Sequence, residues 1–132
     1  MLPIIEKVRT AVSCYVAAQP VPYRTGAEHP TFESLEIGDN QRAFPLALEP
    51  FLLNRYAMAD FARRAQGIGV NYIGVCCGGA PHCVRAMAES LGRTVPASKY
   101  SPAMELHPML GTQVETKDQA FLQDWKGQRE PI

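Results

Sequence analysis

The segment that most constrains the fold is the apolar run at residues 70–75, which leads into the adjacent cysteines Cys76 and Cys77 and then into Gly78 and Gly79. Such a run predicts a parallel strand covered by helices, because the strands of parallel sheets are buried on both faces. The two glycines predict a turn into a following helix. A strand whose carboxyl end carries two thiols is a place to hold a soft metal ion.

Cys76 and Cys77 are poor disulfide partners for each other. A trans peptide holds neighbouring Cα atoms about 3.8 Å apart, whereas a disulfide spans roughly 4.4 to 6.8 Å between Cα atoms. As thiolates on one metal ion the two residues are much better placed. Free cysteines also pack as small buried hydrophobic side chains, so position alone leaves both interpretations open.

Cysteine use and composition exclude several classes of protein. Cys14 and Cys83 stand alone, and four cysteines in 132 residues form no secreted disulfide framework, so we expect a reduced, cytoplasmic protein. With 20% charged residues and a formal net charge of zero, the chain lacks the electrostatic footprint of a nucleic-acid or anionic-membrane binder. No apolar run approaches transmembrane length, and the first residues lack the basic region of a signal peptide.

Hydrophobic periodicity predicts three amphipathic helices and two strands. The predicted helices span residues 4–12, 51–66 and 80–91, and the predicted strands span residues 13–18 and 70–75. Pro3 and Pro81 suit first-turn positions. Gly67 and Gly69 mark the end of the second helix, and Gly92 marks the end of the third. The residues of the third helix that we expect to face inward are Val84, Met87, Ala88 and Leu91.

The order of these elements predicts an α/β fold. Alternating helices and strands imply right-handed crossovers and a parallel sheet. Two strands make no complete sheet, however, and a (β/α)8 barrel typically has about 250 residues. We therefore expect this chain to be the end of a larger barrel, and on its own to expose both edges of its sheet. The connection at residues 19–50 is long enough to be functional.

The residues around the two thiols resemble a known signature. The segment 72–78, Tyr-Ile-Gly-Val-Cys-Cys-Gly, followed by Pro81 and by Val-Arg-Ala at residues 84–86, is similar to the Gly-Gly-Cys-Cys-Gly signature of the zinc-dependent homocysteine S-methyltransferases. Similar stretches occur at residues 19–25, 48–50, 69–73, 96–99 and 104–107. The continuation of the chain past Leu91 resembles the betaine-using members of that family.

The resemblance implies a zinc-bearing (β/α)8 TIM barrel that transfers a methyl group from betaine to homocysteine, giving methionine. In this register, residues 1–95 are the C-terminal part of the homocysteine-binding barrel, with its last two strands and their helices. Residues 96–132 are an extended arm used for homo-oligomer contacts. Zinc is held by three cysteine thiolates, of which two match Cys76 and Cys77, and the fourth position stays open for substrate sulfur.

The chain departs from the family in ways that bear on the site. The family's third zinc cysteine falls before Met1 in this register, and Cys14 enters its strand from the far end of the barrel. Cys83 stands where the family commonly has histidine, and neither it nor His82 is expected to bind zinc. We therefore expect this chain to carry only part of the site and to be inactive alone.

Other hypotheses remain beside the enzyme fragment. The chain could be a non-catalytic partner of a full-length methyltransferase, or a redox or metal-handling module. Gly78 and Gly79 form either a turn, which we favour, or an anion cradle. We expect His29, His82 and His107 to be surface or loop histidines, and Glu49 to be a carboxylate at a helix start. A last helix is expected at residues 115–125, with Trp125 as an interface anchor.

Overall fold

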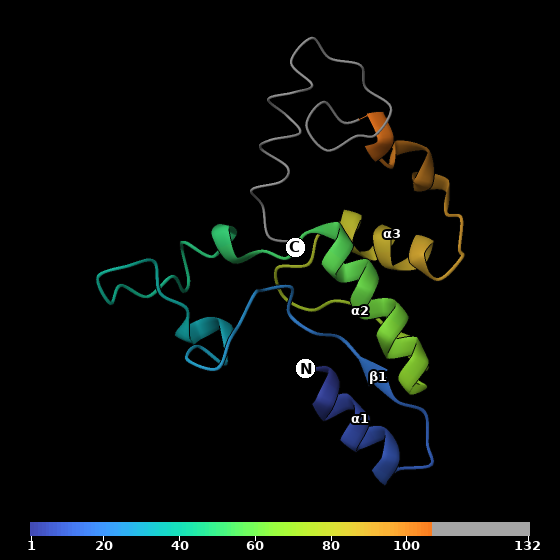
Figure 1. The fold of residues 1–132 in the computed structure, drawn as a ribbon, viewed down its shortest axis with the longest axis horizontal. Helices are drawn as coiled ribbons and strands as arrows, with labels where there is room; N and C mark the ends of the chain where they lie inside the picture. The colour runs from blue at the N-terminus through green and yellow to red at the C-terminus, as the bar shows by residue number, and fades with distance from the viewer. Residues whose placement is uncertain (107–132) are drawn as a thin grey trace, which may run out of the picture. The chain divides into compact units, whose positions relative to one another are not determined.

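The computed structural model describes residues 1–106 (Figure 1). Its α-helices are α1 (Leu2–Ala11), α2 (Arg55–Ile68) and α3 (Pro81–Ser90), and its strands are β1 (Ala17–Ala18) and β2 (Tyr72–Ile73). Four short 3-10 helices span Phe32–Ser34, Glu49–Phe51, Pro96–Tyr100 and Met104–Leu106. Met1–Ser98 form one compact unit, and a second unit begins at Lys99. His107, Trp125 and the helix predicted at residues 115–125 lie outside the described residues.

The two strands pair in parallel, as the alternating pattern predicted. Ala17 lies opposite Tyr72 and Ala18 opposite Ile73. Beyond β2, the N–H groups of Gly74 and Cys76 continue the ladder: Gly74 donates to the carbonyl oxygen of Ala18, and Cys76 donates to that of Pro20. The strands are shorter than predicted. Just before β1, the N–H of Val16 donates to the side-chain oxygen of Asn71 (3.0 Å). A side chain there takes the place of a backbone carbonyl as the acceptor.

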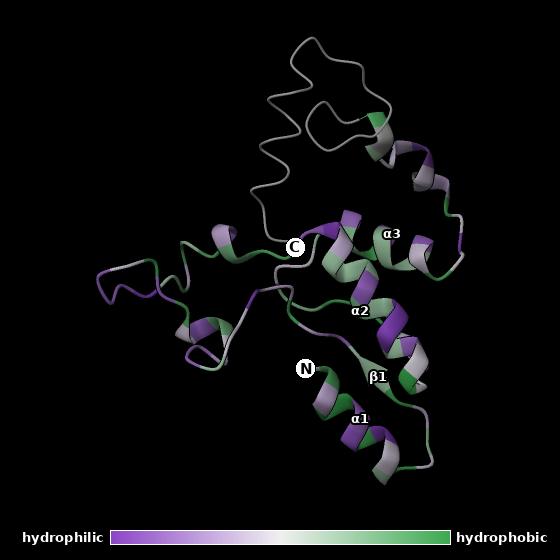
Figure 2. Cartoon of the chain, in the orientation of Figure 1, coloured by the Kyte–Doolittle hydropathy of each residue, from purple (hydrophilic) through white to green (hydrophobic). Residues whose placement is uncertain are grey.

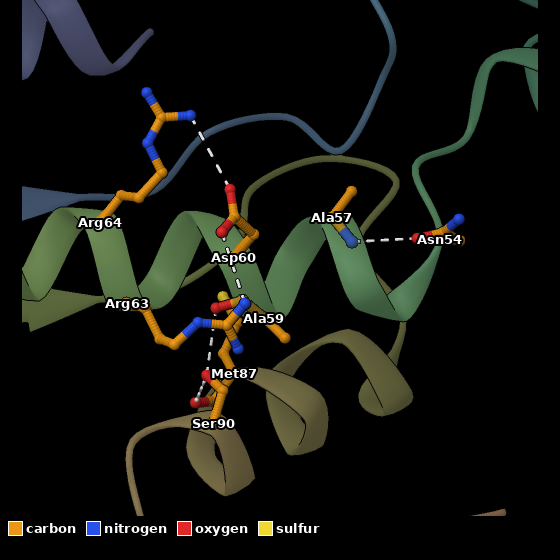
Figure 3. A network of polar contacts seen from close by, with 8 residues as sticks. All are labelled: Asn54, Ala57, Ala59, Asp60, Arg63, Arg64, Met87 and Ser90. Carbon is orange, nitrogen blue, oxygen red and sulfur yellow. Dashed lines mark hydrogen bonds and ion pairs between the residues drawn. The ribbon is translucent and has the colours of Figure 1, made fainter. Parts of the chain in front are cut away.

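The helix α2 begins later than its apolar pattern predicted. Asn54 is its N-cap, and the side-chain oxygen of Asn54 accepts the N–H of Ala57 (2.9 Å; Figure 3). Phe51, the predicted first residue, belongs instead to the preceding 3-10 helix. Of the two glycines predicted to stop the helix, Gly67 lies inside α2, whereas Gly69 ends it with φ of 93°.

The hydrophobic core lies between the sheet and the three helices. One cluster joins α1 and α2 to the strands, and its buried residues are Ile5, Val16, Ala18, Ala65 and Val70. The second cluster joins α2 to α3, and its buried residues are Met58, Ala62, Cys83 and Met87. Phe61 and Ile73 pack against both clusters, so the core is continuous on one side of the sheet. In Figure 2, hydrophobic and hydrophilic positions alternate along α1 and α2.

The inward face of α3 differs from the prediction at one position. Val84 is 51% exposed, whereas Cys83, one residue earlier, is buried. The buried positions Cys83 and Met87 lie one turn apart, and this spacing rotates Val84 away from α2. The Ser90 hydroxyl ties the two helices by donating to the carbonyl of Ala59 (3.2 Å; Figure 3).

The second face of the sheet is open in the described part of the chain. Tyr15 is 89% exposed and Tyr72 is 60% exposed. The prediction that helices cover both faces of residues 70–75 is therefore wrong for residues 1–106. The α1 helix is likewise covered on one side, since Ile5 is buried and Ile4 is exposed. No helix of the described residues is long and apolar enough to span a bilayer. The α/β arrangement agrees with the predicted class, and its place in a (β/α)8 barrel stays a prediction.

Candidate metal centre

The two adjacent thiols lie where β2 leaves the sheet. The N–H of Cys76 donates to the carbonyl oxygen of Pro20 (2.9 Å), which holds Cys76 on the ladder after Ile73. The carbonyl oxygen of Cys76 accepts the N–H of Gly79 (2.9 Å), which closes a turn that leads to α3. Cys76 and Cys77 are both exposed free thiols. The strand therefore delivers them to solvent at its carboxyl end, as the sequence predicted for this junction.

The sulfur atoms of the pair are close enough to share one metal ion. The Sγ atoms of Cys76 and Cys77 lie 3.6 Å apart. Two sulfurs on a tetrahedral zinc, each at about 2.3 Å, are separated by about 3.8 Å, so the observed spacing fits two ligand positions. Among residues 1–106, no group of three or more His, Cys, Asp or Glu side chains is placed to hold an ion. The pair therefore fits part of a zinc site.

Cys76 also influences the protonation of Cys77. The pKa of Cys77 is raised, first because its side chain hydrogen-bonds with Cys76 and then because a Cys76 thiolate would repel a second negative charge. Both causes favour a pair that retains a proton. A bound cation acts in the opposite direction, because it stabilises thiolates. Without a cation, the Cys77 thiol therefore keeps its proton to a higher pH than an ordinary cysteine.

Gly78 and Gly79 are required by the turn itself, which is the role that we favoured for them. Gly78 has φ of +85°, a conformation that residues with a Cβ rarely adopt. A Cβ on Gly79 would lie 2.7 Å from Cγ2 of Val75 and 2.9 Å from the carbonyl oxygen of Cys76. Neither position has room for a larger residue without a shift of its neighbours.

Tyr23 is a neighbour of this turn that the sequence analysis did not single out. Its ring approaches Gly78 so closely that a Cβ there would lie 2.6 Å from Cζ of Tyr23. The ring also stacks on Phe32, with centroids 5.7 Å apart, and Phe32 meets Phe44 edge to face at 5.5 Å. The one signal available in the sequence was the position of Tyr23 inside the family-like stretch at residues 19–25.

A pocket of about 410 Å³ lies beside the turn and shares two of its neighbours, Pro20 and Tyr23. Phe32, Met58 and Phe61 also line it, so most of its wall is apolar. The long connection at residues 19–50 therefore contributes residues both to this pocket and to the surroundings of the thiol pair, and its functional role stays a prediction.

Within residues 1–106, no other predicted residue joins the thiol pair in a group that could hold a metal ion. Cys14 is exposed before β1, and Cys83 is buried between α2 and α3. His82 is exposed on α3 and His29 is half-buried in the long connection. Glu49 opens the first turn of its 3-10 helix, as predicted for a helix-start carboxylate.

Comparisons with known proteins identify relatives for much of the chain. No family model matches it. It is 35% identical to betaine–homocysteine S-methyltransferase 1 of Xenopus tropicalis over 109 residues, which are 82% of this chain and 25% of the relative. It is 52% identical to the protein of the same name from Danio rerio over 48 residues, which are 36% of this chain and 12% of the relative.

A relative with another printed methyl donor also matches. The chain is 40% identical over 70 residues, 52% of its length and 18% of the relative, to S-methylmethionine–homocysteine S-methyltransferase of Rattus norvegicus. The chain thus spans a quarter or less of the length of these relatives. By sequence, this chain belongs to the betaine–homocysteine S-methyltransferase family, as its motifs predicted.

Proposed function

We propose that Cys76 and Cys77 supply two thiolate ligands to a zinc ion in a site that transfers a methyl group from betaine to homocysteine. The observation that carries the proposal is the 3.6 Å separation of two exposed Sγ atoms at the carboxyl end of a parallel strand. The names of the relatives support the methyl transfer and its acceptor. Reduced, ligating thiols are consistent with a cytoplasmic protein.

The residues of this chain have defined roles in such a site. Cys76 and Cys77 bind the ion, Pro20 holds Cys76 in register, and Gly78 permits the turn that presents both thiols. Bound zinc would act as a Lewis acid that favours the thiolate form of a substrate sulfur. Further ligands would come from outside residues 1–106. We expect the chain to carry part of the site and to be inactive alone.

Metal binding to the chain tests this proposal. Co²⁺ titration of the 132-residue chain, followed through the thiolate-to-metal charge-transfer band, should show a site that needs both thiols. Cys76→Ser and Cys77→Ser should each weaken binding strongly, and Cys14→Ser, which changes an exposed thiol elsewhere, is the matched control. Equal binding by all four proteins would contradict the proposal.

The methyl donor is a separate question. Relatives named for betaine and for S-methylmethionine both match this chain. Our proposal of betaine follows the family-like continuation past Leu91. Assays of the chain completed with the remaining part of a family member should show higher kcat/KM with betaine, and a preference for S-methylmethionine would reassign the donor.

A second candidate function is association with another polypeptide without catalysis. Exposed apolar side chains favour it: Ile4 and Val8 on α1, and Tyr15 and Tyr72 on the open face of the sheet. Co-purification with a full-length family member, with no gain in methyl transfer, would support this alternative. The same co-purification tests the role of residues 96–132 as an oligomer arm. If they form such an arm, their removal should abolish association.

A further inference from the structure

We propose that Tyr23 is a positioning residue for the thiol pair, because its ring fixes the turn that carries Cys76 and Cys77. The inference rests on the proposed metal role of the two cysteines. It adds a residue from the long connection, which neither the motif nor the metal chemistry assigns.

The ring and the turn are in direct contact. A Cβ built on Gly78 would overlap the phenol oxygen of Tyr23 and lie 2.6 Å from Cζ and 3.0 Å from Cε2. The ring therefore occupies the space into which Gly78 would otherwise move. On its other side the turn is closed by the hydrogen bond from Gly79 to Cys76. Together these contacts leave the residue after Cys77 little freedom.

Tyr23 is itself held firmly. Its backbone forms an antiparallel bridge with Leu52, and the neighbouring N–H of Arg24 donates to the carbonyl oxygen of Phe51 (2.8 Å). Its ring stacks on Phe32 at an interplanar angle of 22°. No residue among 1–106 hydrogen-bonds to its hydroxyl group, so within the described structure the ring acts through its shape.

Rigidity matters here because the thiols are exposed. Cys77 is exposed, and a loosened turn would let the two Sγ atoms separate beyond the 3.6 Å that suits a shared ion. Groups that orient metal ligands typically contribute about 10- to 100-fold to metal affinity. Tyr23 is the aromatic side chain whose contact with the turn can supply such an effect.

The test compares four variants of the 132-residue chain. Tyr23→Ala removes the ring, Tyr23→Phe keeps most of it, and Gly78→Ala forces the ring away. Tyr15→Ala is the matched control, because Tyr15 is 89% exposed on the open face of the sheet. Three measurements apply: nuclear Overhauser contacts between the Tyr23 ring and the Gly78 Hα atoms, Cd²⁺ affinity, and capture of the dithiol by phenylarsine oxide.

We expect the wild-type chain to show the ring contact. Tyr23→Ala should weaken both Cd²⁺ and phenylarsine oxide binding by about tenfold or more. Tyr23→Phe should lose less, and Tyr15→Ala should match the wild type. Gly78→Ala should lose the ring contact and weaken both probes, which serves as the test if Tyr23→Ala does not fold.

Several results would overturn the inference. They are the absence of the ring contact in the wild type, or equal probe binding by Tyr23→Ala and Tyr15→Ala, or unchanged binding by Gly78→Ala. The proposed function fails separately: a chain that shows Tyr23-dependent arsenical capture but binds Cd²⁺ no better than Cys77→Ser would retain the positioning role and lose the metal role.

Discussion

The backbone N–H of Cys76 donates a hydrogen bond of 2.9 Å to the carbonyl oxygen of Pro20. This bond extends the parallel ladder past Ile73, the last residue of β2. The first of the two thiols is thereby attached to the sheet, while the second, Cys77, lies in the turn beyond it. The backbone of Cys76 is thus bound to the sheet, while both thiol groups are open to solvent.

The pH dependence of alkylation at Cys77 should reveal the coupling of the two thiols. The side-chain hydrogen bond that Cys77 shares with Cys76, and then the charge of a Cys76 thiolate, raise the pKa of Cys77, so thiolate formation at Cys77 shifts to higher pH. In Cys76→Ala both causes disappear, and the midpoint of iodoacetamide alkylation at Cys77 should move to lower pH. Mass spectrometry can resolve the site, with Cys14→Ala as control. A midpoint that is unchanged or higher in Cys76→Ala would contradict this interpretation.

Truncation of Met58 should destabilise the chain strongly. Its side chain is fully buried between α2 and α3, beside Cys83 and Met87. Met58→Ala should lower the free energy of unfolding by about 2–5 kcal/mol through lost burial and a residual cavity. Urea unfolding measures the change, and the exposed Leu46, as Leu46→Ala, should have little effect. Equal stability of the two variants would contradict the described core.

Loss of the Asn71 side chain should weaken the start of the sheet. The N–H of Val16 donates to the Asn71 side-chain oxygen over 3.0 Å in a partly buried place. Asn71→Ala leaves that N–H without its acceptor and should cost about 1–3 kcal/mol in unfolding free energy. Asn71→Asp keeps an acceptor oxygen and should cost less, so an inverted order would argue against this hydrogen bond.

The N-cap of α2 should contribute measurably to helix stability. Asn54→Ala removes the acceptor for the Ala57 N–H and should cost about 1 kcal/mol in unfolding free energy. Asn54→Ser retains a capping oxygen and is the control. Helical content from circular dichroism and urea midpoints together check the result. If Ala and Ser at this position behave alike, the cap is not contributing as described.

Local patterns predicted most elements but not their limits. The apolar run at residues 70–75 predicted a strand that pairs in parallel, and the periodicity predicted three helices in the order observed. The start of α2 was wrong because apolar spacing outweighed the capping side chain of Asn54. The inward face of α3 was wrong at Val84, because a 3.6-residue period does not choose between Val84 and Cys83 until α2 supplies the facing surface.

The site was predictable only in part for a similar reason. Adjacent thiols after a strand predicted a shared ligand role, and the 3.6 Å sulfur separation is consistent with that role. The contact of Tyr23 with Gly78 depends on the path of the long connection, which is set by tertiary pairing of Tyr23 with Leu52. Such non-local contacts leave no periodic signal in the sequence.

The most direct test of the central claim is zinc K-edge X-ray absorption on the zinc-loaded chain, alone and completed with the remaining part of a family member. The account predicts at least two sulfur scatterers at about 2.3 Å from the zinc, and one fewer in Cys77→Ser. A first shell made only of nitrogen and oxygen, or a sulfur count unchanged in Cys77→Ser, would contradict the assignment of Cys76 and Cys77 as a ligand pair.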